Sequence, residues 1–136
     1  MSRYMLDTDT CSYIMKRSNG MVLKRLESLP IDDVCISVIS KAELLFGVEL
    51  SARPDQDGNA LKTFLQYVEV LDFPDGAALF YAKVRADLQK RGAMIGANDL
   101  FIAAHALSLG LTLVTNNTRE FRRVRDLVVE NWAAKS

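Results

Sequence analysis

The segment Tyr4-Met5-Leu6-Asp7-Thr8-Asp9-Thr10 is the strongest signal for the architecture of the chain, because an apolar run leads directly into an acidic turn. Residues 3–6 are predicted to form a short strand, and residues 10–17 a helix after the turn. In an open α/β sheet the carboxyl ends of the strands converge on one crevice. Asp7 is therefore expected at the edge of such a crevice.

The same change from strand to helix repeats along the chain and predicts a mostly parallel sheet covered on both faces. Residues 51–59 contain Pro54 and Gly58 and are predicted to be a loop between two helices. They are not a domain boundary, because neither half of the chain could bury a core alone. Further strands are predicted at residues 34–37, 70–73, 111–114 and 127–129, and further helices at residues 21–29, 40–50, 61–68, 77–90 and 99–109 and around Phe121.

The composition predicts one globular domain over residues 1–136, with 49% hydrophobic and 25% charged residues. No apolar run approaches the roughly 20 residues that a membrane helix needs. The strand-like start of the chain leaves no room for a signal peptide. Cys11 and Cys35 do not form a metal-spaced cluster and are expected to be free thiols. A cytoplasmic protein without membrane association is predicted.

Positive charge is concentrated in two segments, although the formal net charge of the chain is zero. Attraction of the whole molecule to nucleic acid is therefore not expected. Either segment could contact phosphates locally, and the alternative for each is a solvated helix face. One segment contains Arg119, Arg122, Arg123 and Arg125, and the other contains Lys83, Arg85, Lys90 and Arg91.

Four acidic residues are the candidates for a functional site. Asp7 and Glu43 each follow a predicted strand, and Asp99 opens an almost wholly apolar helix. Glu120 lies in the polar segment after the strand at residues 111–114. Converging carboxylates repel one another and are stable together mainly when a hard divalent cation neutralises them. The pattern therefore predicts a metal-dependent enzyme.

Local structure offers another explanation for two of these acids. Asp7 and the residues after it can cap the first helix, because Asp and Thr side chains accept hydrogen bonds from amides of the first turn. Ser40-Lys41-Ala42-Glu43 matches the S-x-x-E capping box, in which the glutamate reaches back to the amide of the cap. A catalytic and a structural interpretation therefore stay open for Asp7 and Glu43.

The sequence around Asp99 favours a functional role over a purely structural one. Asn98 is expected to be the helix cap, which puts Asp99 in the first turn, where the helix dipole favours negative charge. Its neighbours on the same helix face, Ile102 and Ala103 among them, are apolar. An inward-facing carboxylate is costly without a partner, so a function is favoured.

Glu120 and His105 have ordinary structural explanations. A surface salt bridge to a neighbouring arginine is the default for Glu120. His105 lies mid-helix between Phe101 and Leu109 and is expected to be a structural residue. Serine-hydrolase chemistry would need this single histidine, and no nucleophile-elbow motif accompanies it.

The segments Leu6-Asp7-Thr8-Asp9-Thr10 and Leu113-Val114-Thr115-Asn116 resemble two motifs of the haloacid-dehalogenase-type phosphatases. In those enzymes the first aspartate is a nucleophile and the second a general acid. Their later lysine and paired-aspartate motifs have no match between Asn116 and Ser136, where the one lysine is Lys135. A phosphatase is therefore the alternative prediction.

The whole chain resembles the PIN-domain ribonucleases and, within them, the VapC toxins of type II toxin–antitoxin modules. The resemblance implies a three-layer α/β/α fold with a mostly parallel, twisted sheet of about four to five strands. Five segments match in order and spacing: residues 4–9, 36–47, 85–88, 95–106 and 113–121.

The resemblance assigns binding of a divalent cation, Mg²⁺ or Mn²⁺, to Asp7, Glu43 and Asp99. The implied activity is hydrolysis of a phosphodiester in structured RNA, often the anticodon region of one tRNA. A fourth acid often follows the last strand of these toxins in a T-x-D pattern, and this sequence has Asn117 there. Glu120 is the nearest acid. A PIN-like module that binds RNA or protein without activity therefore remains a second alternative.

The resemblance also implies partners. VapC toxins usually form homodimers and are inhibited by a VapB-type antitoxin, with which they form a hetero-oligomer that contacts operator DNA through the antitoxin. Residues 21–29 and 44–65 are predicted parts of the groove for the antitoxin. Arg119, Arg122 and Arg123 are the leading candidates for contact with RNA.

Overall fold

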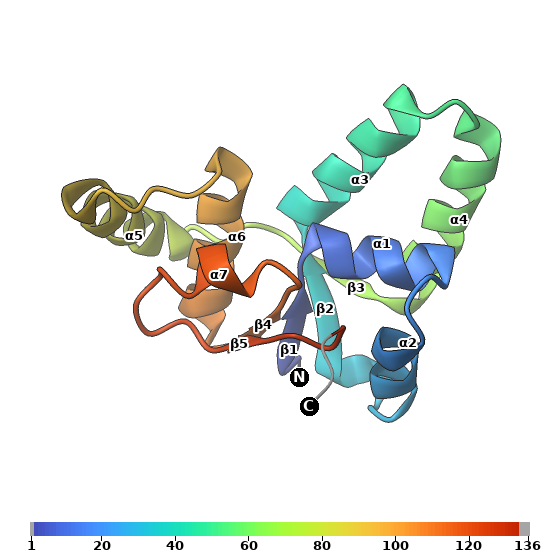
Figure 1. The fold of residues 1–136 in the computed structure, drawn as a ribbon, viewed down its shortest axis with the longest axis horizontal. Helices are drawn as coiled ribbons and strands as arrows, with labels where there is room; N and C mark the ends of the chain where they lie inside the picture. Colours follow the sequence, from blue (N-terminus) through green and yellow to red (C-terminus); the bar gives the residue numbers. More distant parts are fainter. Residues whose placement is uncertain (1, 134–136) are drawn as a thin grey trace.

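The computed structural model describes residues 2–133 and contains a five-stranded sheet with the order β3-β2-β1-β4-β5 (Figure 1). Each neighbouring pair of strands is parallel, which confirms the predicted α/β class. Met1 and residues 134–136 belong to the predicted domain but lie outside the described residues. The strands are β1 (Tyr4–Leu6), β2 (Val34–Ser37), β3 (Glu69–Leu71), β4 (Thr112–Val114) and β5 (Val129–Glu130).

Helices cover both faces of the sheet, as the three-layer prediction requires. Figure 1 shows the first four helices on one side and the last three on the other. A short 3-10 turn, Ile31–Asp33, leads into β2. The helices are α1 (Thr8–Lys16), α2 (Gly20–Glu27), α3 (Val38–Leu50), α4 (Pro54–Tyr67), α5 (Ala77–Arg91), α6 (Ala97–Leu109) and α7 (Thr118–Phe121).

The central strand β1 joins the two halves of the core. Side chains of a strand alternate between its faces, so Tyr4 and Leu6 pack with α1 to α4 while Met5 packs with α5 and α6. All three residues are buried. A central strand of a parallel sheet is covered on both sides, which explains why its sequence is continuously apolar rather than alternating.

The strand order creates a crevice beside the carboxyl end of β1. The chain proceeds from β1 to β2 and β3 on one side, and then crosses to β4 on the other side of β1. Ligands in open α/β sheets bind at such a switch in strand order, outside the carboxyl ends of the strands. Asp7 follows β1 and Thr115 follows β4, so both lie at this position.

The predicted loop at residues 51–59 is wrong, because α4 begins at Pro54. Proline is tolerated at the first helical position, where its missing N–H would have no partner. Asp55 and Asp57 lie in the first turn, where the helix dipole favours negative charge. A Cβ on Gly58 would lie 3.6 Å from Cγ1 of Val48, so the glycine sits at the contact between α4 and α3.

Two predicted helix caps are also wrong. Helix α3 begins at Val38 and its cap is Ser37, whose hydroxyl accepts a hydrogen bond from the amide of Ile39. Ser40 therefore lies inside the helix and cannot form a capping box with Glu43. Helix α6 begins at Ala97 after Gly96, so Asn98 is not its cap. Glu43, predicted to be the partner in a capping box, and Asn98, predicted to be a cap, therefore have side chains available for other contacts.

Other predictions of local structure are confirmed. Asp7 caps α1, with its carboxylate accepting a hydrogen bond from the amide of Thr10. Cys11 and Cys35 are free, buried thiols. The remaining predicted elements differ from the observed ones only near their ends. Across residues 2–133, no helix combines the length and hydrophobicity that crossing a bilayer requires.

Candidate active site

Asp7 forms the floor of the crevice and is only 4% exposed. Its Oδ1 accepts a hydrogen bond of 2.9 Å from the amide of Thr10, and its Oδ2 accepts one from the hydroxyl of Thr115. The Thr115 hydroxyl in turn accepts a hydrogen bond from the amide of Asn117 at 2.9 Å. Burial raises the pKa of Asp7, and the hydrogen bonds from Thr115 and Thr10 oppose that shift.

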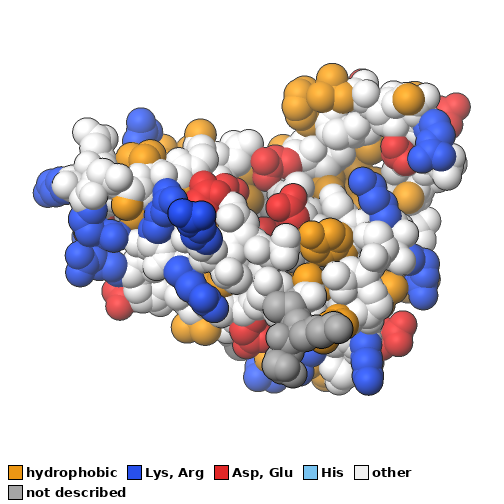
Figure 2. Space-filling model, in the orientation of Figure 1, with side chains coloured by type: hydrophobic (Ala, Val, Ile, Leu, Met, Phe, Trp, Pro, Cys, Tyr) orange, Lys and Arg blue, Asp and Glu red, His pale blue; other side chains and the backbone are white. Residues whose placement is uncertain are grey.

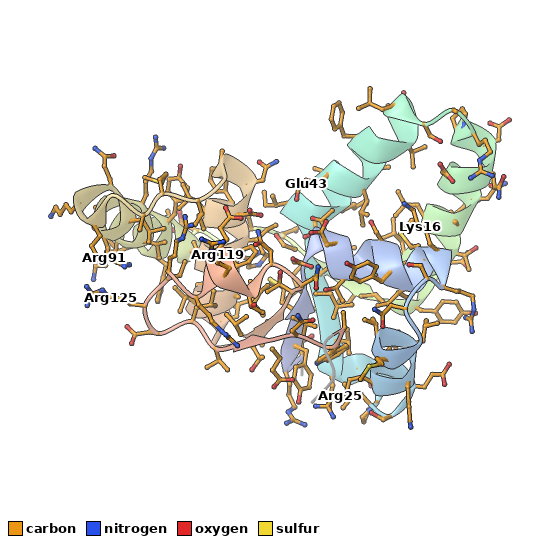
Figure 3. All side chains as sticks on the ribbon, in the orientation of Figure 1. Lys16, Arg25, Glu43, Arg91, Arg119 and Arg125 are labelled. Carbon is orange, nitrogen blue, oxygen red and sulfur yellow. The ribbon has the colours of Figure 1, made fainter. Side chains whose placement is uncertain are left out.

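Glu43 reaches the crevice from the second turn of α3, and both of its carboxylate oxygens have partners. The hydroxyl of Thr8, the first residue of α1, donates to Oε1 at 2.6 Å. The side-chain amide of Asn98, on α6, donates to Oε2 at 3.3 Å. These neutral donors hold the carboxylate without cancelling its charge. Figure 3 labels Glu43 at the lower end of α3, beside α1.

Asp99 and Glu120 face each other on the opposite side of the crevice. The amide of Gly96 donates to Oε1 of Glu120 at 2.8 Å, and the side-chain amide of Asn117 donates to Oε2. Glu120 lies close enough to Asp99 for its negative charge to raise the pKa of Asp99. A Cβ on Gly96 would lie 3.2 Å from Oδ2 of Asp99, so the glycine leaves space for this pair.

The electrostatics of Asp99 show that the four acids converge. Burial raises the pKa of Asp99 to about 7, and the negative charges of Glu120, Glu43 and Asp7 add to that shift. At neutral pH a proton therefore resides on Asp99 for part of the time. Figure 2 shows a group of acidic side chains in the hollow between the α3 side and the α6 and α7 side.

The sequence identified the four acids but not the residues that hold them. Glu120 takes part in this crevice through Gly96 and Asn117, and none of the ion pairs among residues 2–133 includes it, so the expected surface salt bridge is wrong. Asn117, which stands at the T-x-D position, donates its side-chain amide to Glu120. Thr8, Thr115 and Asn98 were missed. Their proximity in sequence to Asp7, Asn117 and Asp99 was the available signal.

The arginines on either side of Glu120 divide into two groups. Arg123 donates to the carbonyl of Met94 at 3.0 Å, and its own carbonyl accepts from Arg91 at 2.5 Å. Arg91 and Arg125 both pair with Asp87. Arg119 and Arg122 are exposed on and just after α7, close in the chain to Glu120. Figure 3 shows Arg119 on α7.

His105 is buried and belongs to the scaffold, as predicted. Its Nδ1 lies 2.8 Å from the hydroxyl of Ser37, the residue that caps α3. Burial lowers the pKa of His105, which favours the neutral ring. The contact ties α6 to the start of α3 beneath the acids, and thereby fixes the two helices that carry Asp99 and Glu43.

The side chains of the crevice fit a hard divalent cation by their chemistry. The donors are carboxylate oxygens, which Mg²⁺ and Mn²⁺ prefer. The proton held by Asp99 relieves the same repulsion that a cation would relieve. Within residues 2–133, no three acidic, histidine or cysteine side chains already stand in an arrangement that would hold a metal ion.

Comparison with known proteins identifies the family. The PIN domain family profile matches residues 4–127. The chain is 40% identical over 130 residues to ribonuclease VapC2 of Rickettsia felis, with 95% of this chain and 97% of the relative covered. This chain is a PIN-domain protein of the VapC ribonuclease family. The phosphatase interpretation of Asp7 and Asp9 is therefore wrong, and Asp9 is exposed on α1.

A further sequence match and a matching crystal structure come from the same organism. The tRNA(fMet)-specific endonuclease VapC of Salmonella typhimurium is 38% identical over 132 residues, covering 97% of this chain and 99% of the relative. The crystal structure of DNA-bound VapBC from Salmonella typhimurium matches with a TM-score of 0.91 and 38% identity, covering 97% of this chain and 99% of that chain. The PIN-like fold predicted from sequence is thereby confirmed.

The raised pKa of Asp99 predicts how the stability of the metal-free protein depends on pH. Asp99 titrates near 3.8 when unfolded and near 7 when folded, so between these values the folded chain binds a proton that the unfolded chain has released. Stability therefore falls as pH rises through this window. In the presence of EDTA, the Asp99→Asn variant should show a flatter dependence of melting temperature on pH and should melt above the wild type at about pH 8.

Asp126→Asn is the matched control for this measurement, because Asp126 is an exposed aspartate in the turn before β5, with a positive φ that Asn also tolerates. Its melting temperature should follow that of the wild type at each pH. An Asp99→Asn variant with the same slope as the wild type would show that Asp99 does not carry the proton.

Proposed function

We propose that this chain is a Mg²⁺-dependent endoribonuclease, with Mn²⁺ able to substitute, and that it is the toxin of a type II toxin–antitoxin pair. The observation that carries the proposal is the convergence of four carboxylates on the crevice at the carboxyl ends of the strands. Burial, together with repulsion from Glu120, Glu43 and Asp7, raises the pKa of Asp99 to about 7. Membership of the VapC ribonucleases supports RNA as the substrate.

Asp7, Glu43 and Asp99 would hold the metal, with Glu120 as the fourth acid of the site. When bound, the cation would polarise the scissile phosphate and lower the pKa of the attacking water. Asp7 is kept in place by Thr115 and Thr10, and Glu120 by Gly96 and Asn117. One of these carboxylates would accept the proton that the attacking water loses, once the cation has replaced the proton of the metal-free site. The products would carry a 5′-phosphate and a 3′-hydroxyl.

A structured RNA, and a tRNA in particular, is the proposed substrate class. The name of the Salmonella typhimurium relative specifies a tRNA, and that protein covers nearly the full length of this chain. A chain of zero net charge needs a local basic surface to bind RNA. Arg119 and Arg122 are suited to this role, because they are exposed and adjoin Glu120, whereas Arg123 is engaged with the carbonyl of Met94.

A VapB-type antitoxin and a second copy of the chain are the proposed protein partners. The matched Salmonella typhimurium structure is a DNA-bound VapBC complex, so contact with operator DNA would come through the antitoxin. Between α1, α2 and α4 lies a largely apolar groove of about 640 Å³, lined by Leu26 and Phe64 among others, that suits an antitoxin segment. Phe46 and Leu50 lie one turn apart on α3 and are 63% and 71% exposed, which suits a homodimer contact.

The proposal extends to the domain organisation and the cellular location of the protein. Residues 1–136 would form one PIN domain, supported by a single sheet whose two faces carry one apolar cluster each among the described residues. A tRNA substrate and two free thiols agree with a cytoplasmic enzyme.

Cleavage of total tRNA by antitoxin-free protein tests the proposed activity. The wild type should cleave with Mn²⁺ and lose activity with EDTA. Asp99→Asn should lower the rate by more than about 100-fold, because even residues that only support metal ligands are typically worth 10- to 100-fold. Asp126→Asn should keep the wild-type rate, because Asp126 is exposed in the turn before β5.

Two results would contradict this activity. Absence of metal-dependent cleavage by the wild type on any cellular RNA would mean that the chain is a binding module without catalysis. Hydrolysis of a small phosphomonoester by the wild type, at a rate that RNA does not affect, would indicate a phosphatase.

The proposed contact of Arg119 and Arg122 with RNA predicts that their substitution affects RNA binding, whereas substitution of Arg123 affects stability. The double variant Arg119→Ala/Arg122→Ala should raise the KM for tRNA and reduce the slope of log affinity against log salt by about 1 per phosphate contact. Lys62→Ala, an exposed cation on α4, should change neither quantity. Arg123→Ala should instead lower the melting temperature, because it removes the hydrogen bond to Met94. Equal KM values for wild type and double variant would refute the RNA contact.

A further inference from the structure

The carboxylate of Glu43 is held between two other helices by neutral side chains. Thr8 on α1 donates to one oxygen at 2.6 Å, and Asn98 on α6 donates to the other at 3.3 Å. Thr8 is 35 residues from Glu43 in the chain, and Asn98 is 55 residues away. Contacts of this kind bring together the starts of α1 and α6 and the second turn of α3, all at the mouth of the crevice.

Glu43 needs such contacts if it is to act as a ligand. A glutamate side chain has several rotatable bonds, and ordering it costs conformational entropy. The negative charges of Asp7, Asp99 and Glu120 also repel it toward solvent. Two hydrogen bonds from opposite sides oppose both effects, because they fix the position of the carboxylate and the plane in which it lies.

The donors are neutral, and this matters for the proposed metal site. A lysine or arginine at either position would compete with a cation for the charge of Glu43. A hydroxyl and an amide leave that charge intact. A carboxylate has about four lone-pair positions, so two hydrogen bonds leave room for a further ligand contact.

The helices themselves do not depend on these two contacts. The buried contact of 2.8 Å between Ser37 and His105 already joins the start of α3 to α6. Thr8 begins α1 but is not its cap, because Asp7 takes that role. Loss of either donor should therefore change the position of one carboxylate and leave the fold intact.

We propose that Thr8 and Asn98 are positioning residues that orient Glu43 for binding of the divalent cation. This inference rests on the proposed metal-dependent function. Thr8 should contribute more than Asn98 to the positioning of Glu43. Its hydrogen bond is shorter and half-buried, whereas that of Asn98 is longer and exposed to competing water.

Direct measurement of Mn²⁺ binding, by electron paramagnetic resonance of the free ion or by calorimetry, tests this role without reference to activity. Thr8→Val removes the hydroxyl at nearly constant shape and should weaken Mn²⁺ binding by about 10-fold. Thr8→Ser keeps the hydroxyl and should restore the wild-type Kd. Asn98→Ala should weaken binding by about 3-fold, as expected for one exposed hydrogen bond.

Asn59→Ala is the matched control for Asn98, because Asn59 is an exposed asparagine on α4, away from the crevice. Melting temperatures measured with EDTA show whether each variant is folded. Wild-type Mn²⁺ affinity in Thr8→Val would overturn the inference and leave the proposed function standing. Equal weakening in Thr8→Val and Thr8→Ser would also overturn it, since the hydroxyl would then not be the cause. A wild-type protein that binds no Mn²⁺ would overturn the proposed function and this inference together.

Discussion

Mutual repulsion among the carboxylates at the carboxyl ends of the strands is the constraint on which the site depends. Asp7, Glu43, Asp99 and Glu120 come from four different places in the chain, and the parallel sheet brings them to one crevice. Burial and the three neighbouring charges raise the pKa of Asp99 to about 7. A group in this situation is stabilised either by a proton or by a cation, and carboxylate oxygens favour a hard divalent metal. The metal-free protein therefore already carries the electrostatic requirement for its proposed cofactor.

The protein holds these acids with neutral hydrogen-bond donors rather than with basic side chains. Thr115 and the amide of Thr10 hold Asp7, while the amide of Gly96 and the side chain of Asn117 hold Glu120. None of the ion pairs among the described residues involves the four acids. Arg91 and Arg125 form their ion pairs with Asp87 instead. The negative charge of the crevice is therefore preserved for a ligand.

Much of the fold could be predicted from the sequence, because its strongest signals are local. The apolar strand before Asp7 and the apolar helix after Asp99 have one plausible conformation each. The start of α4 could not be predicted in the same way. Pro54 and Gly58 usually interrupt helices, and only the tertiary structure shows that one opens α4 and the other packs against Val48.

The acids of the site were also accessible to sequence analysis, but the residues that orient them were not. The capping box at Ser40 and Glu43 was a local explanation, and the observed start of α3 at Val38 removes it. The contacts of Glu43 with Thr8 and Asn98 span large separations in the chain, and no periodic pattern reports such contacts. Hydrogen bonds between distant loops and helix ends depend on the assembled fold, so they appear only in the structure.

Anomalous diffraction from crystals of the protein grown with Mn²⁺ addresses the central claim most directly. The account predicts an anomalous peak in the crevice, within ligand distance of carboxylate oxygens of Asp7, Glu43 and Asp99. A crevice without such a peak, at a Mn²⁺ concentration that supports full cleavage of RNA, would contradict it.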